Sequence, residues 1–237
     1  MVDSKIKENA GKILFLGIFV VAGLIAMRIN FSQLVGSNSQ FFTFFQFFAP
    51  IAGSFLGGLL GAGIVLITQL VDFLFVGKET TLVNLGRLLP LVLAAWYFGT
   101  NDKQKYAIAI PLVAIALFWM HPVGMQVWYF PLLFWTIPIL AKLFFAENLL
   151  AKSLGATLTA HSVGGVVWIY TNSTTAAYWS GLIPIVAYER FLFAIGIAVS
   201  FVALNALFSR VKVPEFVNVN YRMPFATPKP VQLKLKN

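Results

Sequence analysis

Ionisable side chains interrupt the long apolar stretches of this chain of 237 residues. Placing such a group in a bilayer costs about 2.5–3.5 kcal/mol, so it usually faces a bundle interior or a cavity. A guanidinium there can bind a carboxylate or a phosphate in a forked geometry. The ionisable residues are Arg28, Asp72, Arg87, His161, Glu189 and Arg190, accompanied by the uncharged Gln69, Asn84 and Asn205.

Two interpretations of these residues are open. In one, an outward-facing pocket binds a small acidic solute between the arginines and aromatic side chains. In the other, the charges are structural ion pairs, Asp72 with Arg87 and Glu189 with Arg28 or Arg190, because a buried charge needs a partner. His161 lies among small and polar residues, a context that is also typical of a hydrogen-bonded packing residue. The candidate solute-binding residues are Arg28, Gln69, Asp72, Arg87, His161, Trp168, Glu189 and Arg190.

Catalysis, cofactors and metals find little support. The chain has no Cys and two His, which excludes thiol nucleophiles, disulfides and iron–sulfur clusters. It has no P-loop, so we expect no ATP hydrolysis by the chain itself. Tyr188, Glu189 and Arg190 with His161 form a weak acid/base candidate. We therefore expect no enzyme, no cofactor and no metal site.

The elements that position these residues must be membrane helices. Apolar residues make up 59% of the chain and charged residues 11%, against roughly 45–50% and about 25% in soluble domains. The second apolar block is long enough for two short spans joined at Gly57-Gly58. We therefore predict an all-α, polytopic transmembrane bundle of about eight segments, with six or seven as alternatives. The blocks are about 13–35, 41–76, 83–99, 106–120, 126–146, 150–171 and 182–209.

Basic residues predict the orientation. Lys and Arg gather at the N-terminus, in alternate loops and in the tail, and the loops expected outside hold only Lys78. By the positive-inside rule both termini are cytoplasmic. The excess of Lys and Arg over Asp and Glu therefore indicates the orientation of the chain in the cell membrane and not binding to nucleic acid. It divides the chain into a cytoplasmic N-terminus (1–12), a transmembrane domain (13–209) and a basic, Pro-containing cytoplasmic tail (210–237), expected to be extended and solvated. The intramembrane charges then share the outer half of the bilayer.

Small residues predict where helices approach closely. Ala49, Gly53, Gly57 and Gly61 repeat every four residues, a spacing that lets backbones pack together. We expect intramolecular packing there, whereas Ala22 and Ala26 could dock a separate membrane subunit. The run from Phe41 to Phe48 covers a whole helix circumference. Part of it should face lipid, and part could form a hydrophobic gate over an outward pocket.

Several of these features together resemble a known family. They are APIAGSFLGGLLGAG at 49–63, ITQLVDFLF at 67–75, LGRLLPLVLAAWYFG at 85–99 and the pair Ala22 and Ala26. Over about residues 13–99 the chain resembles the substrate-binding S component of energy-coupling-factor vitamin transporters. The resemblance implies a six-span binder of a vitamin-like molecule, partnered by a transmembrane coupling subunit and cytoplasmic ATPases. The metal-transporting branch begins Met-His, and Val2 here favours an organic solute.

The leading hypothesis is therefore a membrane-embedded, substrate-binding transport component for a small organic, acidic solute. The alternative is a non-catalytic scaffold or assembly subunit of a larger membrane complex, in which ion pairs and small-residue faces serve packing alone.

Overall fold

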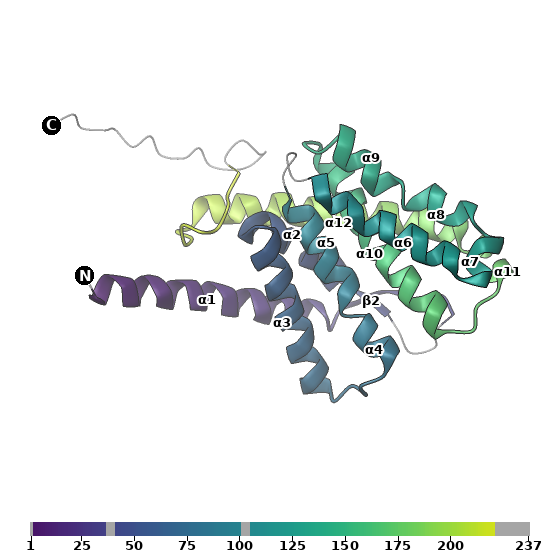
Figure 1. The fold of residues 1–237 in the computed structure, drawn as a ribbon. Coiled ribbons are helices and arrows are strands. Elements are labelled where there is room, and N and C mark those ends of the chain that lie inside the picture. The colour runs from purple at the N-terminus through teal and green to yellow at the C-terminus, as the bar shows by residue number, and fades with distance from the viewer. Residues whose placement is uncertain (1, 37–40, 101–104, 221–237) are drawn as a thin grey trace.

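The computed structural model describes residues 2–36, 41–100 and 105–220, and for residues 2–9 and 105 its account is limited to the backbone. The chain is mainly helical, with one short hairpin (Figure 1). The elements are α1 (Val2–Ala26), β1 (Asn30–Gln33), β2 (Phe41–Thr43), α2 (Phe45–Leu56), α3 (Gly58–Val76), α4 (Leu82–Gly86), α5 (Leu89–Gly99), the 3-10 helix Lys105–Ile108, α6 (Ala109–Met120), α7 (Pro122–Gln126), α8 (Tyr129–Phe134), α9 (Ile137–Phe144), α10 (Leu149–Thr171), α11 (Ala176–Gly181) and α12 (Ile183–Arg210).

Three helical stretches among the described residues are long and apolar enough to cross a membrane: α3, Leu82–Gly99 and α12. Shorter apolar stretches are Ala10–Ala26, Phe45–Leu56, Tyr106–Met120 and Tyr129–Phe144. Every predicted apolar block thus contains helix, and the helical fold class is confirmed. Because a helix rises about 1.5 Å per residue, the shorter stretches cover only part of a hydrocarbon core of about 30 Å.

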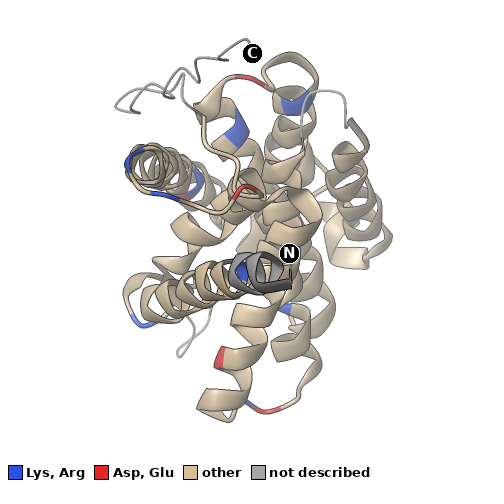
Figure 2. Ribbon diagram, turned by 90° about the vertical axis from the view of Figure 1, so that its left-hand side faces the viewer, with Lys and Arg blue, Asp and Glu red and all other residues tan. Residues whose placement is uncertain are grey.

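The exposed faces of the helices are apolar, as a lipid environment requires. On α3, Leu59, Leu74 and Phe75 are 81%, 77% and 85% exposed. A helix in water would turn such side chains toward a core. Figure 2, viewed from the end where α1 begins, shows charged residues as isolated patches on the ribbon. Composition and surface therefore agree on association with a membrane.

The bundle has two distinct ends. Figure 1 places the start of α1 and the end of α12 at one end, and α7 and α11 at the other. Helices α5 and α10 run antiparallel: a Cβ on Gly86 would meet Val167, and one on Gly155 would meet Tyr97. This antiparallel pair forms the centre of the bundle. It places Arg87, just before α5, near the end of α10, which carries Trp168.

The predicted break and close packing at the glycines are both confirmed. Helix α2 ends at Leu56, α3 begins at Gly58, and Gly57 between them has φ of 83°, which favours glycine. A Cβ on Gly53 would lie 1.8 Å from the Ala95 carbonyl oxygen, and one on Gly61 would lie 2.5 Å from the Gly53 Cα. The repeated small residues therefore let α2, α3 and α5 pack backbone against backbone.

The expected helix over the phenylalanine run is wrong at its start. Phe41–Thr43 forms β2, which pairs antiparallel with β1 in the register Asn30↔Thr43, Ser32↔Phe42 and Gln33↔Phe41. Aromatic and β-branched side chains suit a pleated surface, and the pairing satisfies the backbone between two helices. The chain therefore leaves helix at Ala26 rather than near residue 35. Residues 37–40 lie outside the described part.

The segment after α12 packs against the bundle, although we expected a solvated tail. Val217 is 6% exposed, and the Asn218 N–H donates to the carbonyl oxygen of Phe55 at 2.7 Å. The Asn205 side chain both donates to and accepts from the backbone of Asn220, at 2.8 Å each. Asn205 therefore holds this segment and takes no part in a polar site. Residues 221–237 lie outside the described part of the chain.

Candidate functional site

A cavity of about 470 Å³ lies between the helices, within the range typical of small-molecule sites. Its wall draws on the end of α1, the β1–β2 hairpin, α2, α3, the stretch from α4 to α5, α10, α11 and α12. Every candidate solute-binding residue except Glu189 lines it. The structure thus brings together residues that lie in five separate apolar blocks of the sequence.

Asp72 is held by two cations in the cavity wall. Its side chain is 5% exposed, Lys78 Nζ donates to Oδ2 at 2.6 Å, and the Arg28 guanidinium donates to Oδ1. The pairing considered between Asp72 and Arg87 is therefore not formed. Arg28 and Lys78 are about half exposed. This cluster joins the end of α1 to α3 and the loop that follows it.

Arg87 is positioned at the start of α5 by its neighbours. The Thr81 hydroxyl caps α4 by accepting from the Asn84 N–H, and the Gln69 amide donates to the Leu88 carbonyl oxygen at 2.9 Å. The Arg87 side chain is half-buried and lines the cavity. Among the described residues it has no hydrogen-bond or ion-pair partner. Its forked donors are thus available to a bound anion.

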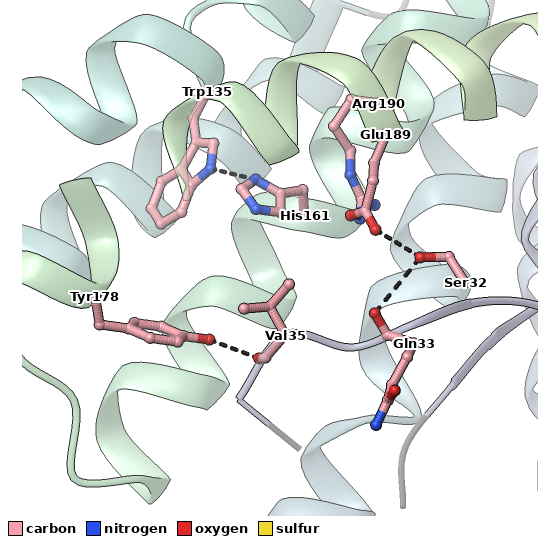
Figure 3. A network of polar contacts seen from close by, with 8 residues as sticks. All are labelled: Ser32, Gln33, Val35, Trp135, His161, Tyr178, Glu189 and Arg190. Carbon is pink, nitrogen blue, oxygen red and sulfur yellow. Dashed lines mark hydrogen bonds and ion pairs between the residues drawn. The ribbon is translucent and has the colours of Figure 1, made fainter. Parts of the chain in front are cut away.

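His161 lines the cavity and accepts a hydrogen bond through one ring nitrogen. The buried Trp135 indole N–H donates to His161 Nδ1 at 3.0 Å (Figure 3). In the neutral ring, an accepting Nδ1 assigns the proton to Nε2. Sequence reasoning missed Trp135, which lies 26 residues away in another apolar block. Nothing in its local sequence distinguishes it from an interfacial tryptophan.

Arg190 is buried with its charge compensated on one side. It is 4% exposed, its Nη2 donates to Glu189 Oε2 at 3.3 Å, and its guanidinium lies 4.8 Å from the Phe42 ring centre and 4.5 Å from that of Phe193. Its Nε has no hydrogen-bond partner among the described residues. A buried, unpaired donor of this kind is costly unless a ligand or water satisfies it.

Glu189, the exception among the candidates, lies outside the cavity wall. Its Oε1 accepts from the Ser32 hydroxyl at 2.7 Å, while Oε2 accepts from Arg190 (Figure 3). The carboxylate therefore ties the hairpin to α12 and orients a cavity arginine. A direct contact between Glu189 and a solute, which the sequence suggested, finds no support in this arrangement.

The hairpin covers part of the cavity, and sequence reasoning missed it. Leu34, Phe41 and Phe42 line the wall, and the Tyr178 hydroxyl donates to the Val35 carbonyl oxygen at 2.9 Å. Burial raises the pKa of Tyr178 above its usual value, so the hydroxyl stays protonated and able to donate. Part of the phenylalanine run thus faces the cavity, as a hydrophobic cover would.

Aromatic side chains complete the wall. Trp179 is 2% exposed and lines the cavity together with Tyr178. The Trp168 indole N–H is buried and makes no hydrogen bond of standard geometry within the described residues, although the Tyr178 hydroxyl lies near it. The cavity therefore combines cationic groups with flat apolar surfaces.

The possible docking residues lie away from the cavity. Ala22 and Ala26 are half-buried, and Ala26 packs against the core. Between them Gly23 is buried, and a Cβ there would meet Thr68 and Phe45. Part of this small-residue face is thus used within the molecule.

Comparison with known proteins identifies a distant relative of unknown role. The chain is 25% identical over 211 residues to an uncharacterized protein of Methanocaldococcus jannaschii, MJ0923, an alignment that covers 81% of this chain and 70% of the relative. No family model and no solved structure matches the chain. At this identity the relative assigns neither a family nor a function.

Proposed function

We propose that this chain is a multi-pass membrane protein that binds a small organic, acidic solute in the cavity and serves as the binding component of a transport system. The observation that carries the proposal is the Arg87 guanidinium in the cavity wall, which has no hydrogen-bond or ion-pair partner among the described residues. The wall also includes Arg190, whose Nε has no partner in the same part of the chain. A non-catalytic scaffold would need neither, since charges that serve packing alone end in satisfied pairs.

The orientation belongs to the same proposal. Eight membrane segments with both termini in the cytoplasm would put the cavity in the outer half of the bilayer. The alternation of basic residues supports this arrangement. So does the position of α1's start and α12's end at one end of the bundle, away from α11 (Figure 1). The solute would then enter from outside the cell.

The partners in the proposed transport system follow from the resemblance to S components. A transmembrane coupling subunit and cytoplasmic ATPases would supply energy, and the face around Ala22 and Ala26 would contact the coupling subunit. The presence of small residues on that face of α1 supports the proposal.

Native mass spectrometry of the gently purified protein tests the binding role. We expect an anionic small molecule bound to the wild-type protein and lost from Arg87→Gln. Hydrogen bonds to charged groups are worth about 1.5–3 kcal/mol, so the affinity should fall by roughly 10- to 100-fold. Arg210→Gln is the matched control, because Arg210 is exposed at the end of α12, outside the cavity. A wild-type protein that carries no small molecule, or equal loss in both variants, would refute the proposal.

A further inference from the structure

We infer that the solute is an elongated, flat molecule with two different ends: a carboxylate or phosphate that binds Arg87, and a neutral hydrogen-bond acceptor that binds His161 and Arg190. The inference rests on the proposed function, because it names the class of solute for the same cavity. It follows from the charge and the hydrogen-bonding groups at two levels of the cavity wall. The first level holds Arg28, Lys78 and Arg87, and the second holds His161 and Arg190.

The Arg87 level carries excess positive charge. Arg28, Lys78 and Arg87 line the cavity there, and Asp72 is the one carboxylate of the described wall. Both oxygens of Asp72 are already taken, by Arg28 and by Lys78. Arg87 has no partner in the described part of the chain, and its fork matches a carboxylate or a phosphate of a bound solute.

The other level offers donors whose charge is already balanced. Glu189 compensates Arg190, the rings of Phe42 and Phe193 pack on its guanidinium, and its buried Nε–H has no hydrogen-bond partner among the described residues. His161 and Arg190 lie close enough to interact electrostatically (Figure 3). With Nδ1 occupied by Trp135, neutral His161 presents Nε2–H. Two donors without net charge favour a carbonyl oxygen or a ring nitrogen over a second anion.

The residues of the two levels lie apart along α10, which favours a long solute. A Cβ on Gly86 would meet the Val167 side chain at 2.7 Å, so Arg87 begins beside that turn of α10. His161 lies six residues before Val167, or about 9 Å along the helix axis. The wall between them includes Gly164, Gly165 and Trp168. Glycines beside an indole leave room for a flat ring system.

The remaining polar side chains do not reverse this polarity. They are hydroxyl or amide groups, which can either donate or accept: Thr43, Gln46, Gln69 and Asn84. The Tyr178 hydroxyl donates its hydrogen bond to the Val35 carbonyl oxygen. Among the described residues of the wall the charged group without a partner is the Arg87 cation, which disfavours a solute bearing an ammonium group.

Three rigid, rod-shaped ligands test the inference by isothermal titration calorimetry on the purified full chain in nanodiscs. The probe is 4-(pyridin-4-yl)benzoate. Biphenyl-4-carboxylate lacks its acceptor nitrogen, and 4-(pyridin-4-yl)benzamide lacks its charge. We expect the probe to bind at least tenfold more tightly than either analogue. Arg87→Gln should abolish the preference for acid over amide, and His161→Phe the preference for nitrogen over carbon, with folding monitored by circular dichroism.

The comparison of ligands on wild-type protein keeps the test decisive if a variant fails to fold. Equal affinity for 4-(pyridin-4-yl)benzoate and biphenyl-4-carboxylate would overturn the two-ended solute and leave the proposed anion site standing. Failure of the probe to bind would also overturn it, while the co-purification experiment decides the proposed function separately. Replacing the carboxylate by a phosphonate distinguishes the two acidic groups, and a preference for either one supports the inference.

Discussion

Asp72 has a role at the residue scale that can be separated from that of the arginines. Replacing it by Asn leaves Arg28 and Lys78 without a counter-charge. Because both cations are about half exposed, we expect a loss of stability of about 1–2 kcal/mol, less than the about 3–5 kcal/mol of a fully buried pair. The same change raises the positive charge of the cavity, so solute affinity should rise roughly three- to tenfold at low salt.

Thermal unfolding and titration with the co-purified solute measure the two effects of Asp72→Asn separately. Arg210→Asn, which removes an exposed charge at the end of α12, is the control for each. Weaker binding by Asp72→Asn would show that Asp72 contacts the solute directly and would contradict the described division of roles.

Several residues of the site could be predicted from sequence because charge is rare in apolar stretches. Arg28, Asp72, Arg87 and Arg190 stand out on that ground alone and do line one cavity. Their pairing could not be predicted, since it depends on which helices are neighbours. Glu189 is the example. It is as unusual in the sequence as Arg190, yet it does not line the cavity and instead bonds to Arg190 and to Ser32 of the hairpin.

At the scale of elements, the close approach of α2 to α5 depends on Gly53. Gly53→Ala would place a Cβ 1.8 Å from a backbone oxygen. We expect a loss of about 1–3 kcal/mol or more, because backbone cannot move aside as a side chain can. Gly63→Ala on α3 is the control, since its Cβ would meet nothing within 4 Å, and it should be neutral or slightly stabilising. Equal melting temperatures of the two variants in detergent would contradict the described packing.

The hairpin is an element whose attachment should set how fast the solute leaves. Ser32→Ala removes the hydrogen bond to Glu189 without changing a residue of the cavity wall. A loss of about 1 kcal/mol corresponds to a roughly fivefold faster dissociation. Stopped-flow tryptophan fluorescence measures that rate. Ser54→Ala on α2 controls for loss of a hydroxyl, and an unchanged rate for Ser32→Ala would show that the hairpin does not restrain the solute.

Elements with a strong local signal could be predicted, and the hairpin could not. The glycine spacing placed the break between α2 and α3 at Gly57, because a positive φ and close backbone contact both favour glycine. The phenylalanine run carries no such signal, since short apolar runs suit helix and strand equally. Its pairing partner, Asn30–Gln33, lies within the apolar block 13–35, whose composition predicts a continuous first helix.

At the scale of the whole molecule, the proposed orientation makes a prediction that the absence of Cys renders easy to test. Cysteines introduced singly at Gly11 and at Gly181 would occupy open space. A membrane-impermeant maleimide should label Gly181→Cys in intact cells and Gly11→Cys only after permeabilisation. Labelling of Gly11→Cys in intact cells would contradict a cytoplasmic N-terminus.

Composition was sufficient to predict a helical chain with apolar helices that associates with a membrane, because so high an apolar content is unusual in soluble domains. It could not predict how the chain closes on itself. The segment from Val213 to Asn220 mixes apolar and polar residues, and it docks on the bundle through Val217 in the core, through Asn205 and through the Phe55 carbonyl oxygen near the end of α2. Such long-range hydrogen bonds leave no periodic pattern in a sequence.

The central claim is that a small acidic solute occupies the cavity, and thiol protection tests it most directly. A cysteine at Gly164 lines the cavity with room for its Cβ, and one at Gly181 lies outside the wall. The small molecules released from denatured wild-type protein should slow maleimide labelling of Gly164→Cys at least tenfold and leave Gly181→Cys unaffected. The slowing should disappear when Arg87→Gln is added. Labelling of Gly164→Cys at the same rate with and without that fraction would contradict the claim.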